Sequence, residues 1–251
     1  MSRTELPRVY ELRDLICDPC NPSAYFQNLD ASLIDEPLKK NAWLVREREF
    51  QRLDAKSWNG LKGEARPYLT SRNSHGRGWQ QLIAILNQAR AHNFLADMGC
   101  SHIQFIPRAS QIGSKTPDLE AKLAEQPVLC EVKTINESEE EITRRTDGRV
   151  GTTTDRLSVG FLNKLGSILR SAKEQLEAHE GSLSARRIAF IVPNFDDSIS
   201  EYKSKYFLQI DEYLYKTPTP GLEIVFFNQW NGFDVQVAMQ NALVINQSSQ
   251  Y

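Results

Sequence analysis

An aspartate, a glutamate and a lysine near the middle of the chain have types and a spacing that could support metal-assisted chemistry. The aspartate occurs in Pro117-Asp118, and the other two occur in Glu131-Val132-Lys133, thirteen residues further on. Two carboxylates that lie side by side repel each other, so such a pair is costly unless a cation lies between them. Hard oxygen ligands of this kind select Mg²⁺, with Mn²⁺ as a substitute. The three residues therefore predict a divalent metal site beside a lysine.

Such a site would be suited to the hydrolysis of a phosphodiester. A metal ion bound by Asp118 and Glu131 could polarise the ester and lower the pKa of a bound water. Lys133 could position that water, help to deprotonate it, or stabilise the negative charge of the transition state. The backbone carbonyl of Val132 is a further candidate metal ligand, with its side chain directed into the core.

Two neighbouring strands would have to bring these side chains together. The pattern predicts strands over residues 117–123 and 128–135, joined by the short stretch Ala124-Glu125-Gln126-Pro127, which suits a hairpin. The two arms are about equal in length, so Asp118 and Glu131 come level within the ~5 Å range of cross-strand neighbours. The lysine shares a strand face with the glutamate because the two are two residues apart.

Helices and strands are predicted on both sides of this hairpin. Apolar periodicity predicts helices over 79–95, 157–178 and 198–214, and strands over 102–107, 187–193 and 222–228. This alternation implies an α/β fold in which helices pack on the faces of a mixed sheet. We expect residues 1–73 to form a mainly helical N-terminal segment and residues 74–251 to form the α/β domain.

The two motifs, placed on a hairpin after one helix and before another, resemble the PD-(D/E)XK nuclease superfamily. The order of elements over residues 79–193 is also similar to that family's restriction-endonuclease-like αβββαβ core. The resemblance implies that Asp118 and Glu131 bind metal and that Lys133 is the catalytic lysine. It further implies a metal-dependent endonuclease of restriction or repair type, a hydrolase acting on ester bonds.

The helices depart from the family pattern, in which many members carry an acidic residue on the first helix. Residues 79–95 contain no Asp or Glu, and Gln81 is the preferred polar candidate there. The family often has a Lys or Gln on the second helix, where the accessory candidates are Lys164, Lys173 and Gln175.

Glu120 lies on the same predicted strand face as Asp118. It is either a second acidic ligand or a solvated charge near the strand end.

An arginine-rich segment follows the predicted catalytic strand. Its four arginines, which could contact phosphates of a nucleic acid, are Arg144, Arg145, Arg149 and Arg156. An ordinary surface loop would have the same composition.

Other functions remain open from these residues. Glu131 and Lys133 could be an exposed strand pair worth a few tenths of a kcal/mol, and Asp118 could belong to a turn. The main alternative function is a non-catalytic module on the same fold that binds nucleic acid or a protein. The acid missing from the first helix favours that alternative.

Composition limits the class of protein. The 251 residues are 40% hydrophobic and 25% charged, as in an ordinary globular protein. No run approaches the ~20 apolar residues of a membrane span, and the charged first residues lack a signal peptide's apolar core. We therefore expect a cytoplasmic protein with no membrane partner.

Charge and cysteine content give weaker guidance. The formal net charge of −2 lacks the basic excess common in DNA-binding proteins, so basic residues would have to gather on one face. Cys17-Asp18-Pro19-Cys20 has zinc-ligand spacing, but no second pair of this kind exists. We expect a nucleic acid partner, DNA in preference to RNA, and a homodimer that would suit cutting both strands.

Overall fold

The chain divides into two units, Met1–Gly99 and Cys100–Tyr251, each held together by its own contacts. The structure is a computed structural model. It describes residues 3–70, 79–107, 116–136, 155–179, 184–193, 200–228 and 243–246. The division falls later than the expected boundary between residues 73 and 74.

The described part of the N-terminal unit is helical. Its elements are α1 (Pro7–Arg13), α2 (Leu29–Asp35), α3 (Pro37–Gln51), α4 (Ala55–Ala65), the 3₁₀ turn Arg66–Tyr68, and α5 (Gln80–Asp97). The helix predicted over 79–95 is α5, and it packs against α3 and α4. The contacts of α5 therefore assign it to the first unit rather than to the sheet-containing unit.

Buried polar contacts join the helices of this unit. The carboxylate of Glu47 on α3 accepts the backbone N–H groups of Arg8 and Val9, which α1 leaves unpaired in its first turn. The guanidinium of Arg90 on α5 lies 2.8 Å from the carboxylate of Glu49 on α3, and both side chains are buried. These contacts tie α1 and α5 to α3.

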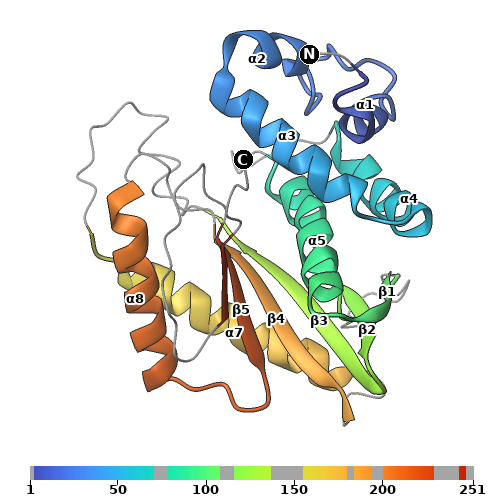
Figure 1. The fold of residues 1–251 in the computed structure, drawn as a ribbon. Coiled ribbons are helices and arrows are strands. Elements are labelled where there is room, and N and C mark those ends of the chain that lie inside the picture. Colours follow the sequence, from blue (N-terminus) through green and yellow to red (C-terminus); the bar gives the residue numbers. More distant parts are fainter. Residues whose placement is uncertain are drawn as a thin grey trace. The chain divides into compact units, whose positions relative to one another are not determined.

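A mixed sheet forms the centre of the C-terminal unit (Figure 1). Its strands are β1 (Ser101–Phe105), β2 (Leu119–Leu123), β3 (Gln126–Ile135), β4 (Arg186–Pro193), β5 (Glu223–Asn228) and β6 (Leu243–Asn246). They lie side by side in chain order. Strand β2 runs antiparallel to both β1 and β3, and β3 to β6 are parallel. The expectation of an α/β fold with a mixed sheet is confirmed.

The hairpin of β2 and β3 has a tight turn. Leu123 pairs with Gln126, which leaves Ala124 and Glu125 as the turn, and Ala124 has a positive φ of 52°. The turn is therefore two residues long, shorter than the predicted connection of four residues. The register runs to Leu119 opposite Cys130, so the next residues along the two arms are Asp118 and Glu131.

Two helices pack on the sheet face that carries Glu131. They are α7 (Val159–Ala178), which begins with the Ser158 side chain accepting the Phe161 N–H, and α8 (Ser200–Lys216). Their apolar residues form one core with alternate residues of β3, β4 and β5; its most buried members are Ile135, Leu165, Leu169, Ala172, Ala189, Ile191, Phe207, Ile210 and Phe226. Because β3 supplies Ile135 to this core, the same packing sets where α7 runs beside Glu131 and Lys133.

None of the helices in the described ranges is long and apolar enough to cross a membrane.

Truncation of a core side chain of α7 tests whether the packing of α7 on the sheet stabilises the protein. Leu169 is 2% exposed in the core between α7 and the sheet, so Leu169→Ala should lower the free energy of unfolding by about 3 kcal/mol. Urea denaturation followed by circular dichroism measures this change. Ser167→Ala, at an exposed position of the same helix, should change stability little, and equal effects of the two substitutions would contradict the packing described.

Candidate active site

The β2–β3 hairpin brings Asp118 and Glu131 together, as the sequence predicts. Asp118 immediately precedes β2, and its Oδ2 accepts the backbone N–H of Val132 at 2.8 Å. The Asp118 carbonyl accepts the N–H of Ile106 at 3.0 Å. Asp118 is thus fixed through both its side chain and its backbone, on the side of β3 next to Glu131.

Glu131 is a carboxyl group buried inside the protein. It is 3% exposed, and its Oε1 lies 2.6 Å from Nζ of Lys133. Its Oε2 is also buried and has no hydrogen-bond donor among the described residues. The pKa of Glu131 is raised to about 8, first by burial and then by the charge of Asp118, while Lys133 acts in the opposite direction. Lys133 therefore cancels only part of the rise in the pKa of Glu131 that burial and Asp118 cause.

Lys133 is held between the carboxyl pair and α7. Its Nζ donates to Oε1 of Gln175 at 3.3 Å, in addition to its contact with Glu131. The amide of Gln175 in turn donates to the backbone carbonyl of Thr116, just before Pro117. One side chain of α7 thus connects the lysine of β3 to the segment that leads into Asp118.

Among the α7 candidates named from sequence, Gln175 is the one whose side chain reaches Lys133. Lys173 lies 3.9 Å from Glu177 of its own helix, and Lys164 donates to the carbonyl of Asn136 at 3.2 Å. Gln175 is therefore better placed than Lys173 for an accessory role beside Lys133.

Cys130 and Val132, the residues on either side of Glu131 in β3, face the opposite side of the strand from Glu131. Val132 is buried, as expected for a side chain directed into a core, and the ligand role of its carbonyl stays a prediction. Cys130 is buried too, and burial raises the pKa of its thiol well above the ordinary value, with the charge of Asp118 adding to the effect. This thiol is therefore neutral at physiological pH.

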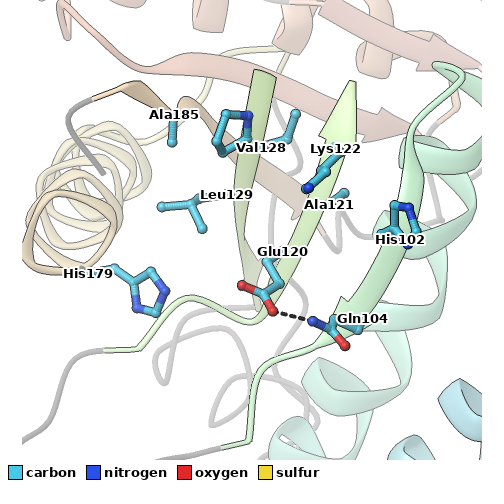
Figure 2. A pocket seen from close by; sticks show the side chains of 10 residues that line it. His102, Gln104, Glu120, Ala121, Lys122, Val128, Leu129, His179 and Ala185 are labelled. Atoms are coloured by element: carbon cyan, nitrogen blue, oxygen red, sulfur yellow. Dashed lines mark hydrogen bonds between the residues drawn. The ribbon is translucent and has the colours of Figure 1, made fainter. Parts of the chain in front are cut away.

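Glu120 lies two residues from Asp118, but its carboxylate is engaged elsewhere. It accepts from the side-chain amide of Gln104 on β1, in a hollow lined by β1, β2, β3, the residue that follows α7 and the residue that precedes β4 (Figure 2). Its candidate role as an accessory metal ligand stays a prediction.

The other candidates from sequence lie apart from this cluster or outside the described residues. Gln81 is exposed on the first turn of α5, in the N-terminal unit, and its candidate role stays a prediction. Arg156 is exposed shortly before α7. Arg144, Arg145 and Arg149 lie outside the described residues.

Two features of the site could not be identified from sequence. The Gln175 bridge depends on where α7 crosses β3, and helical periodicity does not give a crossing position. The hollow beside Glu120 is lined by residues of separate segments, including His102 and His179, which show no motif along the chain.

The arrangement offers one carboxyl pair with an unmatched oxygen and one adjacent ammonium group. Within the described ranges, no group of three or more His, Cys, Asp and Glu side chains is arranged to hold a metal ion. The side-chain carboxyl groups that lie together at this point are those of Asp118 and Glu131. Their chemistry suits a hard cation or the exchange of a proton.

Comparisons with models of protein families, with curated proteins and with solved structures found no match to this chain.

The raised pKa of Glu131 makes stability depend on pH. Its ordinary pKa is 4.5 and its folded value is about 8, so the native state binds an extra proton between these pH values. Stability from this group is present below pH 4.5 and is lost as the pH rises towards 8. Without divalent metal, Glu131→Gln should therefore be more stable than the wild type at pH 9, by roughly 1–3 kcal/mol, and similar to it at pH 4.5.

Urea denaturation in EDTA at the two pH values measures this difference. Glu125→Gln, in the exposed hairpin turn, is the matched control and should follow the wild type at both. A Glu131→Gln variant that keeps the wild-type pH dependence would show that Glu131 is not the titrating group.

Proposed function

We propose that this protein is a metal-dependent endonuclease that hydrolyses phosphodiester bonds, with DNA as its substrate and Mg²⁺ or Mn²⁺ as its cofactor. The observation that carries the proposal is the buried Glu131 carboxyl group. It lies beside Asp118 and in contact with Lys133, and one of its oxygens lacks a donor among the described residues.

The carboxyl pair fits a divalent cation in its chemistry. Two neighbouring carboxylates in a buried position repel each other, and a cation between them would relieve both the repulsion and the unmatched oxygen of Glu131. Mg²⁺ is commonly held by one or two carboxylates, with water and substrate phosphate as its other ligands. Asp118 and Glu131 would hold the ion, with the Val132 carbonyl as the proposed third protein ligand.

The protein groups would share the work of the reaction. When bound, the ion supplies Lewis-acid polarisation of the phosphodiester and lowers the pKa of water. Lys133 places a positive charge beside the carboxyl pair, where it can orient the attacking water and stabilise charge that develops on phosphate. Gln175 limits where the lysine can point, because it accepts from Nζ while its own amide is held by Thr116.

The order of elements supports the proposed membership of the PD-(D/E)XK superfamily. Along the chain α5, β1, β2, β3, α7 and β4 follow one another as in that family's αβββαβ core. The acidic motif lies at the start of β2 and on β3, and the parallel strand β4 follows α7. A restriction or repair enzyme, cytoplasmic and acting as a homodimer, would be consistent with this core.

A second candidate function is a non-catalytic module that binds nucleic acid or protein. The absence of any Asp or Glu from residues 79–95, where many members of the family carry an acid, favours it. Such a module would bind without cutting.

Cleavage assays on defined substrates test the proposed function. Supercoiled plasmid, single-stranded DNA and RNA of the same sequence are incubated with the protein in Mg²⁺, Mn²⁺ or EDTA. DNA should be cut in either metal and not in EDTA. Lys133→Ala and Asp118→Asn should each lower the rate by about 100-fold or more.

Lys216→Ala is the matched control for Lys133→Ala, because Lys216 is an exposed lysine near the end of α8 that pairs with Glu212. It should cut at the wild-type rate. Metal-dependent cleavage that survives in Lys133→Ala and Asp118→Asn would place the chemistry elsewhere. Binding of DNA without cleavage by the wild type would favour the non-catalytic module.

A further inference from the structure

A hollow of about 240 Å³ opens at Glu120 within the C-terminal unit. Its lining comes from β1, β2, β3, the residue that follows α7 and the residue that precedes β4. These residues are His102, Gln104, Glu120, Ala121, Lys122, Pro127, Val128, Leu129, His179 and Ala185 (Figure 2). None of them belongs to the cluster of Asp118, Glu131 and Lys133.

The hollow lies one step along the sheet from the proposed catalytic residues. Glu120 is two residues from Asp118, and Leu129 is two residues from Glu131, so each pair shares a strand face. Two residues of a strand span about 7 Å. This is comparable to the spacing of neighbouring nucleotides in a single strand, so a nucleotide adjoining the reacting phosphate would come over the hollow.

The lining favours a nucleobase over a phosphate. Most of its surface is apolar, and the lining includes Leu129, Pro127 and Ala185, which suit contact with a flat ring. The Glu120 carboxylate would repel a phosphate, but it can accept hydrogen bonds from an amine. The side-chain amide of Gln104 donates to this carboxylate and so holds it in place at the wall of the hollow (Figure 2).

We propose that this hollow binds the base of the nucleotide next to the cleaved phosphodiester, and that it selects bases carrying an exocyclic amine. The inference rests on the proposed nuclease function. Cytosine and adenine carry such an amine where uracil and thymine present a carbonyl oxygen, and guanine carries one on its other edge. A carboxylate accepts from the amine and repels the carbonyl oxygen, so Glu120 is the specificity-determining residue.

The test compares binding of two oligonucleotides that differ in this one group. Fluorescence anisotropy is measured with oligo(dC) and oligo(dU) of about eight nucleotides, in Mg²⁺. The full chain carries Lys133→Ala, so that binding is observed without cutting. Binding to oligo(dC) should be tighter by about tenfold, the effect of one good base contact.

Variants of the hollow assign the preference to Glu120. Glu120→Gln should reduce it to about threefold or less, because an amide both donates and accepts and so distinguishes amine from carbonyl poorly. Glu125→Gln, the same substitution in the exposed turn, should keep the preference. Ala185→Phe, which would fill the hollow, should also remove it.

Equal binding of the two oligonucleotides, or a preference that survives in Glu120→Gln, overturns the inference. Different results would overturn the nuclease proposal. If the wild type cuts DNA with no base preference, the nuclease stands and the base site falls. If the preference depends on Glu120 but the wild type does not cut in Mg²⁺ or Mn²⁺, the hollow binds an amine-bearing base in a protein that is not a nuclease, and the nuclease proposal falls.

Discussion

The interaction on which the rest of this structure depends is the contact of the buried Glu131 carboxyl group with Asp118 on one side and Lys133 on the other. Removing a carboxylate from water costs several kcal/mol even after relaxation of the protein, unless opposite charge or hydrogen bonds offset it. Lys133 offsets part of this cost, and the pKa of Glu131 nevertheless stays near 8. The metal-free protein therefore keeps a proton on Glu131 at neutral pH, where a cation would displace it.

Several elements around this group hold it in place. The tight hairpin sets Asp118 level with Glu131, and the parallel pairing of β3 with β4 makes β3 an interior strand of the sheet. The core of α7, α8 and the sheet then places Gln175 where it can accept from Lys133. Packing on several sides therefore keeps a carboxyl group with a raised pKa in this buried position.

Much of this arrangement could be predicted from the sequence, because local patterns encode it. The alternation of apolar and polar residues, together with the turn residues, predicts both strands of the hairpin. The apolar run at 187–193 predicts the interior strand β4. The pairing of Asp118 with Glu131 followed from nearly equal hairpin arms. These features depend only on residues that are close together in the sequence.

The remainder depends on packing between distant segments. The sequence pattern predicts helix α5 beside the sheet, but its buried polar contacts with α3, including Arg90 with Glu49, place it in the N-terminal unit. Gln175 could not be chosen over Lys173, because both lie on α7 and only the helix crossing decides between them. The engagement of Glu120 with Gln104 depends on how β1 pairs with β2 across the irregularity in its register.

The most direct measurement of the central claim is the number of protons released when the protein binds Mg²⁺. Isothermal titration calorimetry at pH 7, in two buffers of different ionisation enthalpy, gives this number. A cation held by Asp118 and Glu131 should release about one proton from Glu131, and Glu131→Gln should abolish the release. Mg²⁺ that binds without releasing a proton, or that fails to bind at all, would contradict the account of this carboxyl pair as a metal site.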